Sequence, residues 1–95
     1  MPFPESFLQE LKLRSDITEI ASSYVNLKRH GRNMVGLCPF HGEKTPSFNI
    51  YTENGSFYCF GCGAGGDVIT FIMKIENLDY VEAVSSLHKG RYGNA

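Results

Sequence analysis

Four potential metal ligands stand in two pairs with equal spacing. Two residues separate Cys38 from His41, two separate Cys59 from Cys62, and 17 residues lie between the pairs, enough for a β-hairpin that brings them together. Three thiolates and one imidazole make a closed tetrahedral Cys₃His set, which is typical of structural Zn²⁺. We therefore predict one structural zinc ion, bound by Cys38, His41, Cys59 and Cys62.

Three other interpretations of the cysteines are weaker. Cys59 and Cys62 alone would fit a redox pair, but such a pair follows a strand in a βαβ unit, whereas an aromatic strand and a glycine-rich turn flank this one. Three structural core cysteines are common but would not explain the position of His41. Three cysteines cannot all pair in disulfides, and no secretory signal is recognised. Zinc is favoured over all three.

The size of the chain agrees with a metal-stabilised domain. A sequence of 95 residues, 42% hydrophobic with 7 Phe and 5 Tyr, predicts one small globular domain whose core alone is marginal. Zinc binding would then contribute on the order of 10 kcal/mol to folding. No apolar run is long enough to span a bilayer and no targeting segment is recognised, so we expect a cytoplasmic protein without a membrane partner.

Before the first ligand pair, the pattern changes from helical to extended. Apolar spacing over residues 5–14 predicts a short helix behind Pro4. Asp16 and Glu19 form a possible capping box for a second helix, whose buried face would contain Ile17, Ile20, Ala21 and Tyr24. Residues 25–29 and 34–37 then alternate like strands around a turn at 30–33.

A second hairpin and two further helices follow. Phe48 and Ile50 would share one face of a strand, Asn54-Gly55 would turn the chain, and residues 56–59 would return to the metal. We expect the ligand pairs to cap opposite ends of this small sheet. After a glycine-rich turn at 63–66, Asp67 is the expected N-cap of an apolar, sandwiched helix over 68–75. Asp79 is expected to cap a last helix with a buried stripe of Tyr80, Ala83, Val84 and Leu87.

These elements predict a small α+β zinc ribbon, an antiparallel β-sheet with a Cys₃His zinc site and short flanking helices. We assign residues 1–95 to one domain, with a helical lead-in at 5–24, a zinc ribbon at 25–66, C-terminal helices at 67–88 and a frayed tail at 89–95.

The charge distribution is more informative than its sum. The formal net charge is −1, but residues 20–52 carry Lys28, Arg29, Arg32 and Lys44 against Glu43 alone, which is a local +3. On charge alone, these residues fit a solvated basic face without a partner as well as they fit a nucleic-acid site. Interleaved aromatic residues favour binding, because unpaired bases stack on them.

One family matches these motifs over residues 5–87. The sequence resembles the zinc-binding N-terminal domain of bacterial-type DNA primase, the enzyme that makes RNA primers in DNA replication. The matching runs are Cys38-Pro-Phe-His41-Gly-Glu-Lys44-Thr-Pro-Ser-Phe48, Phe57-Tyr58-Cys59-Phe60-Gly61-Cys62-Gly63, and Gly65-Gly66-Asp67-Val68-Ile69 with Phe71. Such a dense match is far more specific than a generic zinc-finger spacing.

The resemblance implies that the domain recognises a single-stranded DNA template within the primosome. It implies Cys38, His41, Cys59 and Cys62 as zinc ligands, and a catalytic primase domain in cis or in trans as partner. Basic and aromatic positions of the sheet would contact the template, here Lys28, Arg32 and Lys44, with Phe57 or Tyr58 nearby. Because neighbours in a strand face opposite ways, only one of these aromatics can be on the surface, and we favour Tyr58.

We do not expect the chain to be catalytic by itself, although it resembles part of a nucleotidyltransferase. Phosphoryl transfer uses clustered carboxylates around two metal ions, but the ten acidic residues are scattered and form no Asp-x-Asp pair. A closed Cys₃His set also leaves no open position on zinc. We expect no small-molecule substrate. The alternative is a stand-alone zinc ribbon that binds protein in a replication or mobile-element system.

Overall fold

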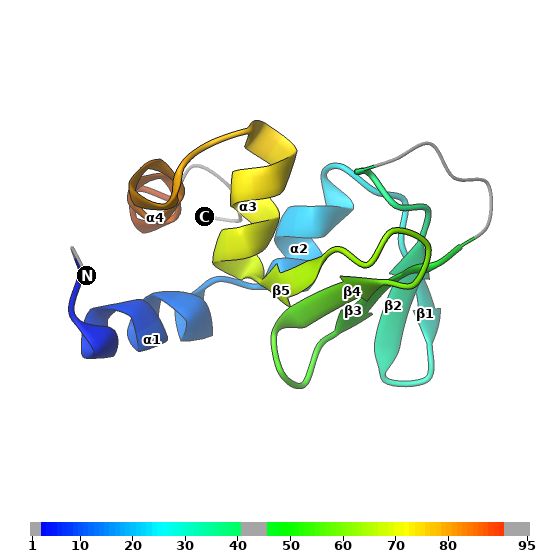
Figure 1. The fold of residues 1–95 in the computed structure, drawn as a ribbon. Coiled ribbons are helices and arrows are strands. Elements are labelled where there is room, and N and C mark those ends of the chain that lie inside the picture. Colours follow the sequence, from blue (N-terminus) through cyan, green and yellow to red (C-terminus); the bar gives the residue numbers. More distant parts are fainter. Residues whose placement is uncertain (1–2, 41–45, 91–95) are drawn as a thin grey trace.

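The computed structural model, which describes residues 3–40 and 46–90, contains one five-stranded antiparallel sheet with helices against one of its faces (Figure 1). The strands follow one another across the sheet in chain order: β1 (Lys28–His30), β2 (Asn33–Gly36), β3 (Phe48–Tyr51), β4 (Ser56–Cys59) and β5 (Gly65–Asp67). The helices are α1 (Glu5–Arg14), α2 (Ile17–Ser22), α3 (Val68–Glu76) and α4 (Tyr80–His88). The predicted fold class, a small antiparallel sheet with flanking helices, is confirmed.

Three helices begin at the aspartates that the sequence indicates. The Asp16 carboxylate accepts hydrogen bonds from the backbone N–H groups of Thr18 and Glu19, and Asp67 accepts from that of Thr70. Asp79 and Glu82 bond reciprocally to each other's backbone N–H groups in a capping box. Each carboxylate satisfies donors that the first helical turn leaves unpaired. Local sequence therefore sets the starts of α2, α3 and α4.

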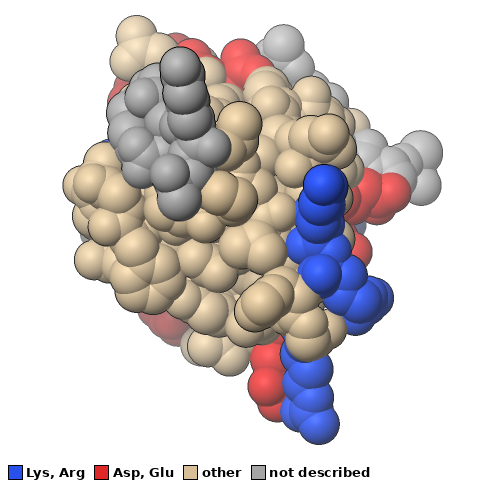
Figure 2. All heavy atoms as spheres, turned by 90° about the vertical axis from the view of Figure 1, so that its right-hand side faces the viewer, with Lys and Arg blue, Asp and Glu red and all other residues tan. Residues whose placement is uncertain are grey.

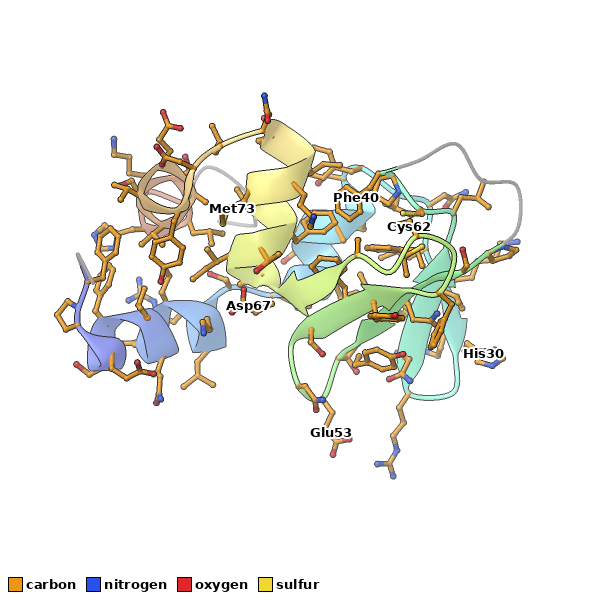
Figure 3. The ribbon with its side chains drawn as sticks, viewed as in Figure 1. His30, Phe40, Glu53, Cys62, Asp67 and Met73 are labelled. Atoms are coloured by element: carbon orange, nitrogen blue, oxygen red, sulfur yellow. The ribbon has the colours of Figure 1, made fainter. Side chains whose placement is uncertain are left out.

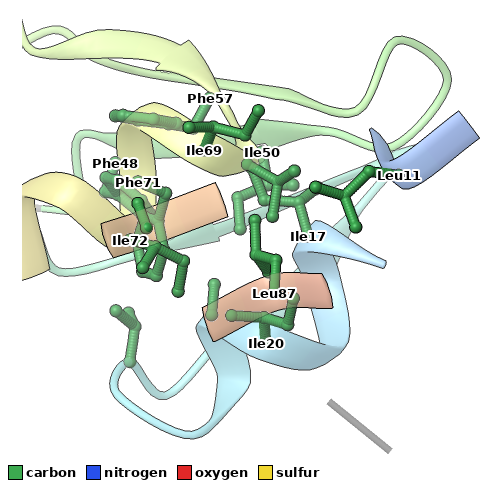
Figure 4. Packing of buried hydrophobic residues seen from close by; sticks show 14 of the residues in the cluster. Leu11, Ile17, Ile20, Phe48, Ile50, Phe57, Ile69, Phe71, Ile72 and Leu87 are labelled. Carbon is green, nitrogen blue, oxygen red and sulfur yellow. The ribbon is translucent and has the colours of Figure 1, made fainter. Parts of the chain in front are cut away.

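The sheet has two faces of different character. The inner face is buried and carries Phe48, Ile50 and Phe57, which pack against apolar side chains of α2 and α3 in one cluster (Figure 4). Within this cluster, the rings of Phe48, Phe57 and Phe71 lie against one another, with centroid distances of 5.6 to 6.1 Å. The opposite, outer face carries Tyr58, of which 39% is exposed. The predicted alternation of Phe57 and Tyr58 is confirmed.

All three cysteines lie at one end of the sheet, so the expectation that the ligand pairs cap opposite ends is wrong. Cys38 follows the end of β2, and Cys59 ends β4 opposite Phe48, the first residue of β3. In Figure 3, Phe40 and Cys62 lie together at this end, and Glu53 lies at the far end, in the turn between β3 and β4. Both hairpin turns lie at that far end, so after each turn the chain runs back to the metal-binding end.

The glycine run after the second pair contains a strand as well as a turn. β5 pairs with β4 through Tyr58 and Gly65, Phe57 and Gly66, and Ser56 and Asp67. A Cβ on Gly65 would stand 2.8 Å from a Tyr58 ring carbon, so only glycine lets this strand lie under the ring. The sequence predicts only the turn, because glycine is a turn residue by local preference.

Tyr24 also departs from its expected position. α2 ends at Ser22, so Tyr24 lies beyond the helix and is 38% exposed instead of belonging to a buried helical face. Its ring packs edge-on against Phe71, and its hydroxyl donates a hydrogen bond to Glu76. Of the predicted frayed tail, residues 91–95 lie outside the described residues, and the division of the chain into segments stays a prediction. Within the described ranges, no helix has the length and apolar character needed to cross a membrane.

Candidate metal centre and nucleic-acid interface

Three cysteine sulfurs meet at the end of the sheet where β2 and β4 finish. The Sγ atoms of Cys38, Cys59 and Cys62 all lie within 4.8 Å of one another, and those of Cys38 and Cys62 are 3.8 Å apart. A disulfide would require about 2.05 Å. A tetrahedron with Zn–S bonds of about 2.3 Å has an edge of about 3.8 Å. The cluster therefore has the spacing of thiolates that share one zinc ion.

A backbone N–H and a side-chain hydroxyl lie close to two of the sulfurs. The Phe40 N–H donates to Cys38 Sγ at 3.4 Å, and the Ser47 hydroxyl lies 3.6 Å from Cys59 Sγ. Without a metal ion, burial raises the pKa of the Cys38 thiol to about 12. Burial also acts to raise the pKa of Cys59, but hydrogen bonds from Ser47 and from the Cys62 and Gly61 backbone outweigh it and lower that pKa. A divalent cation stabilises thiolates strongly, and these N–H and O–H donors would add to its effect.

A tight turn joins Cys59 and Cys62, the two ligands of the second pair. The Gly63 N–H donates to the Cys59 carbonyl at 2.8 Å, and Gly63 has a φ of 80° that suits glycine. This turn places Cys59 and Cys62 on the same side. His41, the predicted fourth ligand, lies outside the described residues, three positions after Cys38.

The outer face brings together two of the residues predicted to contact nucleic acid. Strand register places Lys28 opposite Val35, Val35 opposite Asn49, and Asn49 opposite Tyr58. Directly paired residues of an antiparallel sheet point to the same side, so Lys28 and Tyr58 both lie on the outer face. Across three strand spacings of about 4.8 Å, they are about 14 Å apart.

Phe60 is an outer-face residue in addition to those predicted from the sequence to contact nucleic acid. Its N–H continues the sheet by donating to the Ser47 carbonyl at 2.9 Å, and 68% of the residue is exposed. Its ring meets the Tyr58 ring edge-on, with centroids 4.9 Å apart. The same period-2 alternation that selects Tyr58 also selects Phe60, so the signal was present in the sequence.

The remaining predicted contacts lie elsewhere. Arg32 is in the turn between β1 and β2, where Thr52 Oγ1 donates to its carbonyl, and it lines a groove toward the α1–α2 junction instead of the outer face. Lys44 lies outside the described residues. Figure 2 shows Lys and Arg side chains gathered along one side of the face that carries β1 and β2, next to a broad area without charged side chains.

A family model matches almost the whole chain. The CHC2 zinc finger family matches residues 3–92. A DNA primase of Geobacillus stearothermophilus is 52% identical over 84 residues, which are 88% of this chain and 14% of the relative. A DNA primase of Clostridium acetobutylicum is 53% identical over 83 residues, 87% of this chain and 14% of the relative. The chain thus spans a small part of the length of these curated relatives.

A solved structure agrees with the sequence matches. The crystal structure of the Aquifex aeolicus primase, comprising zinc-binding and RNA polymerase domains, superposes with a TM-score of 0.83 and 43% identity over 94% of this chain and 22% of that one. The family model, the solved structure and the sulfur cluster agree on one structural zinc ion, which confirms that prediction. The chain therefore belongs to the CHC2 zinc finger family and is a zinc-binding domain of the bacterial DNA primase type.

Proposed function

We propose that this domain binds single-stranded DNA and so recognises the template for a DNA primase. The observation that carries the proposal is the strand register that puts Lys28 and Tyr58 on one exposed face. An ammonium group can contact a phosphate, and an exposed aromatic ring can stack on an unpaired base. Phe60 extends the aromatic surface beside Tyr58.

The zinc ion would be held by Cys38, Cys59, Cys62 and His41. The three thiolates are already grouped, and a closed tetrahedral site needs one further ligand. His41 has the same spacing from Cys38 as Cys62 has from Cys59. Such an ion supplies structure, because it ties the end of β2 to the end of β4 and so fixes the order of the strands that make the outer face.

Primer synthesis itself would belong to another part of the primase, in cis or in trans. The relatives are much longer than this chain, and the Aquifex protein has an RNA polymerase domain besides its zinc-binding domain. The acidic residues of this sequence are dispersed, which does not suit two-metal phosphoryl transfer. We therefore propose a non-catalytic module that presents template to a catalytic partner in the cytoplasm.

An NMR titration of the zinc-loaded chain with short single-stranded DNA tests the proposal. We expect shifts at Lys28, Tyr58 and Phe60 that weaken as salt is added. Lys28→Ala should weaken binding. If the variant loses one phosphate contact, the slope of log binding constant against log salt concentration should become shallower by about 0.7. Lys74→Ala, which removes an exposed lysine from α3, is the matched control and should leave both unchanged. Binding with the same salt slope in Lys28→Ala would contradict the assigned contact.

Protein binding is the second candidate, and one surface favours it. A groove of about 730 Å³ lies between the α1–α2 junction and the hairpin turns, and Leu13 on its wall is 87% exposed. A large exposed leucine beside a groove is typical of protein interfaces. If no single strand causes shifts even at low salt, this function replaces template recognition.

A further inference from the structure

The outer face is hollowed at its β1–β2 edge. A cavity of about 450 Å³ opens there, which is within the range of small-ligand sites. Its apolar wall consists of Val35, Leu37 and Pro46, and 47% of Leu37 is exposed. We call this cavity the β1–β2 hollow. It contains none of the three clustered cysteines, and it shares one lining residue, Arg29, with the groove beside α1.

The polar groups around the hollow suit an anionic ligand. Its rim carries Lys28, Arg29 and His30, and its described lining contains no acidic residue. Among the described residues, the side chains of Lys28 and His30 make no hydrogen bond or ion pair, and Arg29 bonds only to the Gly31 carbonyl at 3.5 Å. The charged side chains of Lys28 and Arg29 are therefore available to a ligand that combines a flat apolar part with negative charge.

The hollow is continuous with the surface already assigned to the template. Lys28 belongs to both, and the register joins Val35 of the hollow to Tyr58 through Asn49 alone. A strand that stacks on Tyr58 and Phe60 and crosses the sheet would reach the hollow after about two further strand spacings, or about 10 Å.

We propose that the β1–β2 hollow accepts one unpaired base of the template strand and is where this domain distinguishes one base from another. The proposal rests on the proposed function. The rings of Tyr58 and Phe60 can stack on any base, so they give affinity without selection. Asn26 lines the hollow, and its amide both donates and accepts hydrogen bonds, as discrimination between base edges requires.

Binding of short single strands that differ at one position measures the selection. The zinc-loaded chain is titrated with strands of one length that carry A, C, G or T at each position in turn. We expect a preference of about fivefold or more at one position, as for a base-edge contact. Asn26→Ala should remove most of this preference while binding persists. Leu37→Ala should weaken binding to the preferred strand and shrink the preference.

Leu13→Ala is the matched control, because Leu13 is also an exposed leucine but lies on α1, away from the hollow. Asn26 and Leu37 are both exposed, so their variants should keep the fold and its zinc. If the wild type binds without preference, or both variants keep it, the hollow does not select a base. If neither wild type nor variant binds any strand, template recognition fails as well, so the two failures are distinguishable.

Discussion

At the scale of single residues, two neighbouring side chains of β4 differ in burial because they lie on opposite faces of the sheet. Phe57 is 2% exposed and packs against Phe48 and Phe71, whereas Tyr58 is 39% exposed and lies over Gly65. One position along a strand thus separates the hydrophobic core from the proposed template surface, because side chains alternate between the faces of a sheet.

Substitution of each neighbour by alanine should separate stability from binding. Phe57→Ala should destabilise the domain by about 3–5 kcal/mol, the range for removing a buried aromatic ring. Tyr58→Ala should cost far less stability but weaken single-strand binding by about 1–3 kcal/mol. Urea unfolding and DNA titration of both variants provide the check. Normal DNA affinity in a folded Tyr58→Ala variant would remove Tyr58 from the interface.

At the scale of elements, one aspartate joins three segments. Asp67 ends β5, caps α3 through the Thr70 N–H, and its Oδ2 atom lies 3.0 Å from the Nζ atom of Lys12 in α1. Burial acts to raise its pKa, but the hydrogen bond from Thr70 and the charge of Lys12 outweigh burial and lower it. Figure 3 shows Asp67 where the sheet meets the helices. The folded state therefore favours the ionised form of the Asp67 side chain over its protonated form.

The stability due to the Asp67 charge should depend on pH in a defined direction. Because the folded-state pKa is depressed, this stability is present above the unfolded value of about 4 and is lost as the pH falls through the folded value. Asp67→Asn keeps a good N-cap and removes the charge, whereas Asp67→Ala also removes the cap, at a cost of about 1 kcal/mol.

Unfolding of the three proteins from neutral pH downward measures this dependence. The difference in unfolding free energy between wild type and Asp67→Asn should shrink as the pH falls toward about 4, and it is measured above the pH at which the thiolates release zinc. A gap that widens in acid would show that the carboxylate is not favoured by the fold.

At the scale of the whole molecule, the zinc site and the hydrophobic core support one sheet. A single cluster of buried residues joins α1, α2, the sheet, α3 and α4, and it includes Cys38 and Cys59. The metal-binding end and the core are therefore not independent units. Loss of the metal should release the sheet from which the core is built.

Removal of zinc should unfold most of the domain. Structural zinc sites contribute on the order of 10 kcal/mol, which is comparable to the whole stability of a typical domain, about 5–15 kcal/mol. Titration with a chelator, followed by circular dichroism and amide dispersion in NMR, should show loss of the sheet, and added zinc should restore it. Cys62→Ala should resemble the chelated protein, and Ser22→Ala, at an exposed position on α2, should not. A folded, metal-free Cys62→Ala variant would contradict the structural role.

The sequence alone determined features that depend on near neighbours. Ligand spacing predicted a zinc ion, aspartates marked the starts of α2, α3 and α4, and alternation placed Phe57 inside and Tyr58 outside. Dense motifs also predicted the family. These signals work because turns, caps and the two-residue period of a strand are set by a few consecutive residues.

Only the tertiary structure decided which distant residues share a surface. Strand register placed Lys28, Val35 and Tyr58 on one face, opened the hollow beside them, and left Arg32 at a hairpin turn. It also paired Gly65–Asp67 with β4 as a strand and brought the three cysteines to the same end of the sheet. Pairing between strands is fixed by the packing of the whole core and not by any local run of residues, so spacing along the chain could not reveal it.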